Sequence, residues 1–171
     1  MPAALLDVAD LPALLGRFAR LMGIDLGTKT IGLALSDVER RIATPLETIR
    51  RTKFASDARQ LLNFLDQFEV AAIVIGLPLN MDGSEGPRAQ STRAFARTLA
   101  PLAARPIVFW DERLSTAAVT RELIGQNASR AKRAEVVDRM AAAYILQGAL
   151  DRLAVLARSE KASSDISQPQ Q

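Results

Sequence analysis

The chain has 171 residues, the size of one domain, and its 49% hydrophobic content is enough for a sizeable core. It contains no cysteine and no histidine, which excludes disulfides, zinc sites built on thiolate or imidazole, and Ser-His-Asp chemistry. Carboxylates remain as the hard metal ligands, and the net charge of +3 permits a nucleic-acid partner without requiring one.

Residues 1–19 are predicted to form an N-terminal helical extension. Leu11, Leu14, Leu15 and Phe18 follow the spacing i, i+3, i+4, i+7, which places them on one helical face. No apolar run approaches the roughly 20 residues of a membrane span, and no signal-peptide pattern opens the chain. We therefore expect a cytoplasmic protein with no membrane partner.

Residues 20–36 are predicted to form a β-hairpin that buries an acid. Two apolar runs are joined by a polar turn that begins at Gly27. Asp25 ends the first run, and a carboxylate in a buried strand is costly unless it is paired or bound to a cation. The alternative is an Asp that caps its own backbone in the turn. We favour a metal-binding role for Asp25, because an apolar run precedes it.

The rest of the chain alternates between strands and helices. A third strand over residues 41–50 contains Pro45, which indicates an edge position or a bulge. Periodicity and apolar runs predict further strands over 71–75 and 106–110 and helices over 54–68, 89–103, 115–124 and 133–157. Residues 125–132 are polar and without periodicity, and the Ser/Gln-rich tail 158–171 is typical of disorder.

This order predicts an α/β domain over residues 20–157. Its mixed five-stranded sheet consists of three antiparallel strands extended by two parallel strands, flanked by helices. Sites in such sheets gather at the carboxyl ends of the strands. Asp25 ends the first strand, Glu112 ends the last and Asp138 begins the final helix, so three acids that are distant in sequence can converge.

Clustered carboxylates bind hard divalent cations such as Mg²⁺ or Mn²⁺. One or two such ions can activate water and stabilise the leaving oxygen of a phosphodiester. Glu112 competes with Asp111 for this role, because side chains alternate along a strand, and spacing alone leaves the choice open. Asp138 lies on an apolar helical face, although a first-turn acid that complements the helix dipole is an equally good interpretation.

Several basic residues are candidate contacts for a nucleic-acid backbone. They are Lys29, Arg88, Arg113, Arg130, Lys132 and Arg133. The last three form a cluster just before Asp138, and beside a metal site such a cluster is a reasonable phosphate contact. The alternative is that these side chains are simply solvated on the surface. For Arg113 a further alternative is an ion pair with Asp111. Aromatic residues make up only 5% of the chain, which disfavours base stacking.

Four motifs follow one another along the chain: DLGTKTIGLA over 25–34, GLPLNMDG over 76–83, DERLST over 111–116, and Val137-Asp138 with Ala141-Ala142. Together they resemble the YqgF (RuvX-type) family of RNase H-like nucleases, over roughly residues 20–152. The resemblance implies an RNase H-like fold and Glu112, in place of Asp111, as the site acid. It also supports Asp25 and Asp138 as metal-binding and catalytic acids. The family is thought to process the 5′ end of precursor 16S ribosomal RNA, and was first described as candidate Holliday-junction resolvases.

We therefore predict a metal-dependent nuclease that acts on structured RNA, with branched DNA as the alternative substrate, as a monomer or homodimer. Two other classes of protein were weighed against it. Asp-x-Gly-Thr also opens the phosphate loops of actin-like and sugar-kinase domains, but that architecture needs two such domains and 171 residues supply one. A non-catalytic RNA-binding scaffold is expected to have lost its acids, and all three are present.

Overall fold

The computed structural model describes residues 5–114 and 130–167, and side chains of α4 from Glu135 onward. Its strands are β1 Leu5–Leu6, β2 Arg20–Leu26, β3 Thr30–Ser36, β4 Ala43–Arg50, β5 Val70–Leu77 and β6 Ile107–Asp111. Its helices are α1 Phe54–Gln67, α2 Pro87–Ala103 and α4 Arg130–Ile166, with short 3-10 helices η1 Val8–Ala13 and η2 Glu112–Leu114.

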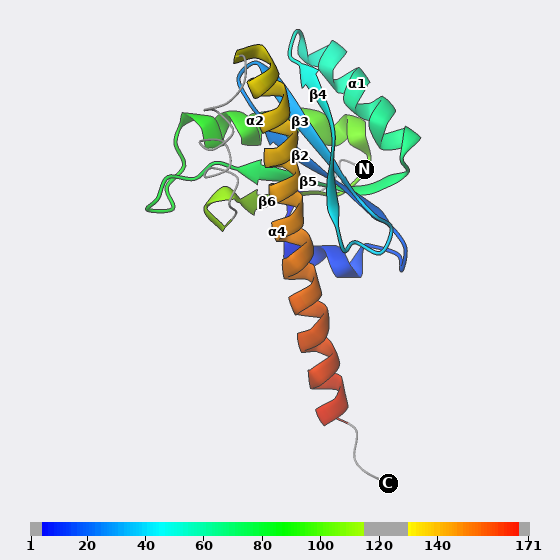
Figure 1. Ribbon diagram of the computed structural model, residues 1–171. Coiled ribbons are helices and arrows are strands. Elements are labelled where there is room, and N and C mark those ends of the chain that lie inside the picture. The colour runs from blue at the N-terminus through cyan, green and yellow to red at the C-terminus, as the bar shows by residue number, and fades with distance from the viewer. Residues whose placement is uncertain (1–4, 115–129, 168–171) are drawn as a thin grey trace.

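The strands form one mixed sheet in the order β1-β6-β5-β2-β3-β4 (Figure 1). β2, β3 and β4 are antiparallel neighbours, whereas β5 and β6 join the sheet in parallel. The predicted five-stranded arrangement is confirmed, and the two-residue β1 adds a sixth strand beside β6. Pro45 lies on the edge strand β4 at a register shift against β3, because proline cannot donate to the sheet ladder.

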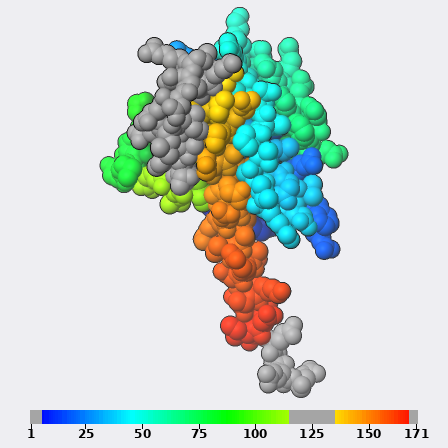
Figure 2. All heavy atoms as spheres, viewed as in Figure 1, coloured from blue at the N-terminus to red at the C-terminus, as the bar shows by residue number. Residues whose placement is uncertain are grey.

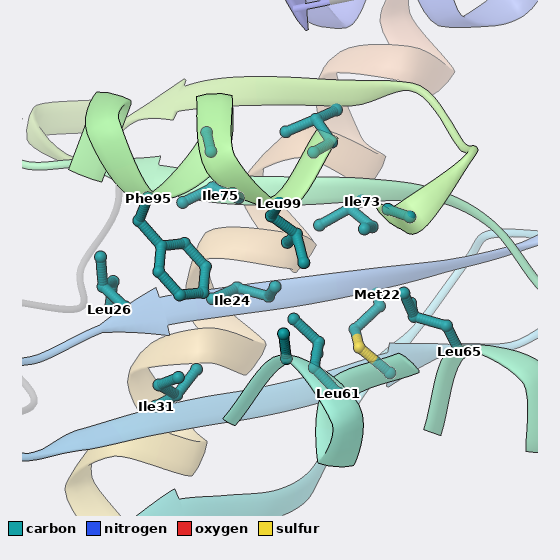
Figure 3. Close-up of a cluster of buried hydrophobic side chains, with 14 of the residues drawn as sticks. Met22, Ile24, Leu26, Ile31, Leu61, Leu65, Ile73, Ile75, Phe95 and Leu99 are labelled. Atoms are coloured by element: carbon teal, nitrogen blue, oxygen red, sulfur yellow. The ribbon is translucent and has the colours of Figure 1, made fainter. Parts of the chain in front are cut away.

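Helices cover both faces of the sheet. α1 and α2 pack against one face through large apolar side chains, among them Leu61, Leu65 and Leu99 in contact with the β2 residues Met22 and Ile24 (Figure 3). On the other face, α4 packs across the central strands through a second buried cluster. The α4 members of that cluster are Ala142, Ile145, Leu146, Ala149 and Leu150. The alternation of side chains along each strand divides the sheet residues between the two clusters.

The N-terminal segment differs from the predicted helix. Residues 5–6 pair with β6, and η1 buries Val8 and Leu11 in the α4-side cluster. A 3-10 helix has three residues per turn, so Val8 and Leu11 share one face. Leu14 and Phe18, which the helical prediction placed on one face together with Leu11, are 54% and 60% exposed.

The C-terminal segment differs from the predicted disorder, because α4 continues to Ile166. Its last turns extend beyond the body of the molecule (Figures 1 and 2). By length and composition alone, Glu135–Ile166 passes a test for a membrane span, a test that the core helix of a globular protein passes equally. The division of the chain into extension, domain and tail stays a prediction, and the predicted helix 115–124 lies outside the described residues.

Candidate metal centre

Asp25 lies near the end of the central strand β2 and is only 2% exposed. Gly23, two residues earlier on the same face, would place a Cβ against the backbone of α4, so the Asp25 side chain points toward α4 as well. β2 has strand neighbours on both sides, and this fixes the backbone position of Asp25. The antiparallel register places Gly32 of β3 opposite Asp25, and the parallel register brings Gly76 of β5 to the same level.

Gly32 allows the backbone of α4 to approach the sheet next to Asp25. A Cβ added at Gly32 would lie 2.0 Å from the carbonyl oxygen of Asp138, which no side chain can satisfy without moving the helix. The hydroxyl of Thr30, two residues away on the same strand, donates a hydrogen bond to the Asp138 carboxylate. The absence of a side chain at Gly32 therefore sets the height of Asp138 above the sheet, and Thr30 orients its carboxylate.

Gly76 performs the same function on the other side of Asp25. A Cβ added there would lie 2.7 Å from Oε1 of Glu112, so the Glu112 carboxylate lies directly over this strand position. Val108 and Trp110 of β6 belong to the α4-side cluster, and Glu112 continues their alternation. The choice that spacing left open between Asp111 and Glu112 is thereby decided in geometric terms: Glu112 lies on the α4 face.

The structure brings the three predicted acids to one end of the central strands. Adjacent strands lie about 4.8 Å apart, so Glu112 over β5 and Asp138 over β3 each lie about one strand spacing from β2, where Asp25 stands. Within the ranges 5–114 and 130–167, no three acidic side chains are gathered closely enough to be recognised as a metal site. The donor set still suits a hard divalent cation, since all three candidates offer carboxylate oxygens.

Polar contacts from β4 anchor the first described turns of α4. The Thr48 hydroxyl donates to the Glu135 carbonyl at 2.7 Å, and Arg50 donates through Nε and Nη2 to Glu135 Oε1 at 3.2 and 2.9 Å. Further along α4, the Ala43 N–H donates to Gln147 Oε1 at 2.9 Å. Because Asp138 lies between these anchors, its position relative to the sheet is fixed.

Hydrogen bonds also hold the hairpin turn that follows Asp25. The Gly27 N–H donates to the Thr30 carbonyl at 2.9 Å, and the Arg51 N–H donates to the Lys29 carbonyl at 2.9 Å. The Arg51 side chain reaches back to the Gly27 carbonyl, with Nη1 at 2.7 Å. The turn is therefore held from both of its ends, and the Lys29 side chain is exposed on it.

The predicted basic residues fall into three groups. Lys29 and Arg88 are exposed and lie near the end of β2 and at the start of α2. Arg113 is bound to the protein itself: it donates to Asp111 at 2.7 Å and to the Met81 carbonyl at 3.2 Å. The Arg113 hydrogen bond lowers the pKa of Asp111. Arg130, Lys132 and Arg133 belong to α4, and their side chains lie outside the described residues.

Sequence reasoning did not single out the residues that position the acids. Thr30 and Gly32 belong to the motif over 25–34 and Gly76 to the motif over 76–83, but the motifs alone do not indicate what these residues do. A glycine within an apolar strand indicates a close approach by another part of the chain, and this signal was available at both positions. Arg51 carried no comparable signal, because its contact with Gly27 depends on how β4 ends.

The family described as RuvX, Holliday junction resolvase, matches residues 19–152. The chain belongs to the RuvX family. The match contains Asp25, Glu112 and Asp138 together with strands β2 to β6, and it leaves out β1 and the projecting end of α4.

Relatives of this RuvX protein are similar over nearly their full length. A protein of Methylocella silvestris is 70% identical over 153 residues, which cover 90% of this chain and 95% of the relative. A protein of Beijerinckia indica is 71% identical over 154 residues, covering 90% and 93% of the two chains. Each of these proteins is described as a candidate pre-16S rRNA nuclease.

Solved structures share the fold at low sequence identity. The RuvC of Thermus thermophilus in complex with a Holliday junction substrate has a TM-score of 0.52 and 17% identity, covering 80% of this chain and 96% of RuvC. The yeast mitochondrial Holliday junction resolvase Ydc2 has a TM-score of 0.55 and 16% identity, covering 93% and 88%. The RuvX protein therefore has the RNase H-like fold that its motifs predicted.

Proposed function

We propose that this RuvX protein is a divalent-metal-dependent nuclease that cuts structured RNA, with the 5′ end of precursor 16S rRNA as its substrate. Membership of the RuvX family makes it a hydrolase acting on nucleic acid. The RNA assignment is supported by the descriptions of the Methylocella and Beijerinckia relatives. Relatives of this kind are bacterial proteins, and we place the present one in the cytoplasm, as a monomer or homodimer.

One observation carries the proposal: Asp25 is a buried acid flanked by two glycine positions over which Asp138 and Glu112 lie. A single carboxylate in this position would only be a cost to folding, because a charge out of water needs a partner. Three carboxylates around one strand end offer the oxygen donors that Mg²⁺ and Mn²⁺ prefer. We assign Asp25, Glu112 and Asp138 as ligands for one or two such ions.

The residues have separate tasks in this proposal. Asp25 holds its carboxylate on β2, a strand with neighbours on both sides, and Thr30 keeps the Asp138 carboxylate turned toward the hairpin. Glu112 supplies a carboxylate from the opposite side of Asp25. A divalent cation held by these three carboxylates would supply the Lewis-acid chemistry that activates water for attack on a phosphodiester. Lys29 and Arg88, both exposed near this end of the sheet, contact the substrate backbone.

Branched DNA is the alternative substrate, and the family description favours it. A Holliday junction offers the same phosphodiester chemistry as RNA, so the acids alone cannot discriminate between the two. A non-catalytic scaffold is disfavoured, because such a protein is expected to have lost its acids and all three are present.

Cleavage of two substrates side by side tests the proposal. A 5′ segment of precursor 16S rRNA and a four-way DNA junction are incubated with the protein in Mg²⁺, in Mn²⁺ and in EDTA, with Asp25→Asn as the matched control. We expect metal-dependent cleavage of the RNA and a loss of at least about 100-fold in Asp25→Asn, since metal-assisted stabilisation is worth several kcal/mol. Normal cutting by a folded Asp25→Asn protein contradicts the metal assignment, and cutting of the junction alone overturns the RNA assignment.

A further inference from the structure

A hollow lies beside the hairpin turn, on the side of the sheet that α1 and α2 cover. Its volume is about 160 Å³, and its lining includes Leu26, Thr28, Arg51, Pro87, Arg88 and Ser91. Leu26 belongs to the α1 and α2 side of the sheet, whereas the neighbouring Asp25 points toward α4. The hollow is therefore a separate feature, joined to the metal centre by the turn that begins at Gly27.

The lining of this hollow suits an anion. It contains two arginines and the hydroxyl-bearing residues Thr28, Ser91 and Thr92, and none of the described residues that line it is acidic. Guanidinium groups and hydroxyls are the usual side-chain donors to phosphate oxygens, and arginine adds a planar fork that matches phosphate geometry. Leu26 and Pro87 supply an apolar wall, against which the sugar of a nucleotide can pack.

Arg51 is pre-positioned for such a contact. Its Nη1 donates to the Gly27 carbonyl at 2.7 Å, and its guanidinium carbon lies 6.0 Å from the centre of the Phe95 ring. In the part of the chain that the structure describes, the Gly27 carbonyl is the acceptor that we find for this side chain. A guanidinium has five N–H donors, so Arg51 retains donors for a ligand while its orientation is already fixed.

The position of the hollow relates it to the acids. Gly27 and Thr28 follow Asp25 by two and three residues, and Thr30 of the same turn donates to Asp138. A sugar-phosphate backbone with one phosphodiester at the acids can cross the turn and place a neighbouring phosphate beside Arg51 and Arg88. Contacts of this kind fix the register of a nucleic-acid strand without reading its bases.

We propose that this hollow, formed by Arg51, Arg88, Thr28 and Ser91, binds a backbone phosphate of a nucleotide adjacent to the bond that is cut. The proposal rests on the nuclease function proposed above and adds a subsite to it. No sequence pattern singles out Arg51. Its task here is to hold the strand in register, so that one phosphodiester is presented to Asp25, Glu112 and Asp138.

Binding measured without cleavage tests this subsite. In the Asp25→Asn background, the affinity for a short fluorescent single-stranded RNA is measured by anisotropy over a range of salt concentrations. We expect Arg51→Gln and Arg88→Gln each to weaken binding several-fold and to reduce the slope of log K against log salt by about 0.7, the value for one phosphate contact on a single strand. Arg97→Gln removes the same charge from an exposed position of α2 that does not line the hollow, and its slope is expected to stay at the parent value.

Two arginine variants are used so that a misfolded protein is not mistaken for the loss of a phosphate contact. Arg51 holds the hairpin turn, so thermal unfolding of Arg51→Gln is recorded beside its binding. Arg88 is exposed, and its replacement leaves the turn intact. Equal slopes for Arg88→Gln and Arg97→Gln overturn the subsite. Cleavage by the protein with Asp25 intact is scored separately, so absent cleavage identifies a failure of the nuclease proposal and an unchanged salt slope identifies a failure of the subsite.

Discussion

On strand β2, Met22, Ile24 and Leu26 point toward α1 and α2, whereas the alternate residues Leu21, Gly23 and Asp25 point toward α4. The first face of the sheet is filled by large apolar side chains throughout (Figure 3). The second face is apolar as well, through Leu21 near the start of β2 and through Trp110 and Ile145 nearer its end. Toward the end of β2, the neighbouring strands carry glycines in place of large side chains on this face. The α4 backbone and the carboxylates can therefore approach the sheet closely.

This difference shows where stability and chemistry are located in the molecule. Large buried side chains on the α1 and α2 face supply transfer and packing free energy. On the α4 face, Gly32 and Gly76 give up such contacts so that Asp138 and Glu112 can reach the level of Asp25. Substitutions on the two faces should therefore affect different measurable quantities.

Among substitutions outside the three acids, Gly32→Ala is expected to have the largest effect on cleavage. The added methyl group would lie 2.0 Å from a backbone oxygen of α4, which has no flexible end that can move aside. The helix must shift, and a misplacement of about 1 Å in a catalytic group can cost about 100-fold in rate. We expect at least that loss in metal-dependent cleavage, together with a lower melting temperature, measured by cleavage assay and circular dichroism.

Gly16→Ala is the matched control for this experiment. No heavy atom lies within 4 Å of the Cβ that it adds, so cleavage and melting temperature should stay at the wild-type values. If Gly32→Ala cleaves as fast as Gly16→Ala, the close contact between β3 and α4 does not position Asp138.

Leu61→Ala tests the other face of the sheet. Leu61 of α1 is fully buried among the apolar side chains of this face (Figure 3), on the opposite side of the sheet from α4. Truncation of a buried leucine to alanine costs about 2 to 5 kcal/mol in free energy of unfolding. We expect that loss in urea denaturation, with a cleavage rate near wild type at a temperature where the variant is folded. A large fall in the rate of the folded variant would contradict the separation of the two faces.

The sequence was sufficient for the sheet, whereas the metal-binding role of the three acids stays a prediction. The apolar runs of β2, β3, β5 and β6 are continuous and bounded by turn residues, so their order determines the mixed sheet. That order also predicts that Asp25 and Glu112 lie near one edge of the sheet, because sites gather at the carboxyl ends of strands. The structure places Glu112 over β5 and Asp138 over β3. The family resemblance favoured Glu112 over Asp111 as the site acid. The physical reason is that side chains alternate along a strand, so Glu112 follows Trp110 on the α4 face.

The two ends of the chain and the glycine contacts could not be derived in the same way. Leu11, Leu14 and Phe18 fit a helical spacing, but Pro12 and Gly16 interrupt that segment, and Asp7 caps a 3-10 helix at its start. The polar residues beyond position 158 have no packing partner to reveal a helix, which propagates from the buried part of α4. Contacts such as that between Gly32 and Asp138 join residues far apart in sequence and carry no local pattern.

Asp111→Asn is expected to have the smallest effect and distinguishes Asp111 from its neighbour Glu112. The Arg113 hydrogen bond lowers the pKa of Asp111 below its ordinary value of 3.8. A lowered pKa means that the folded protein favours the ionised carboxylate, so this stabilisation is present above pH 4 and is lost as the pH falls through the folded-state pKa. Urea denaturation should therefore show wild type more stable than Asp111→Asn at pH 7, by less than the effect of Leu61→Ala, and the difference should shrink toward pH 3. Because Asp111 lies off the α4 face, cleavage at neutral pH should stay near wild type, whereas Glu112→Gln should abolish it. A stability difference that persists unchanged at pH 3 would show that Asp111 acts through packing and not through its charge.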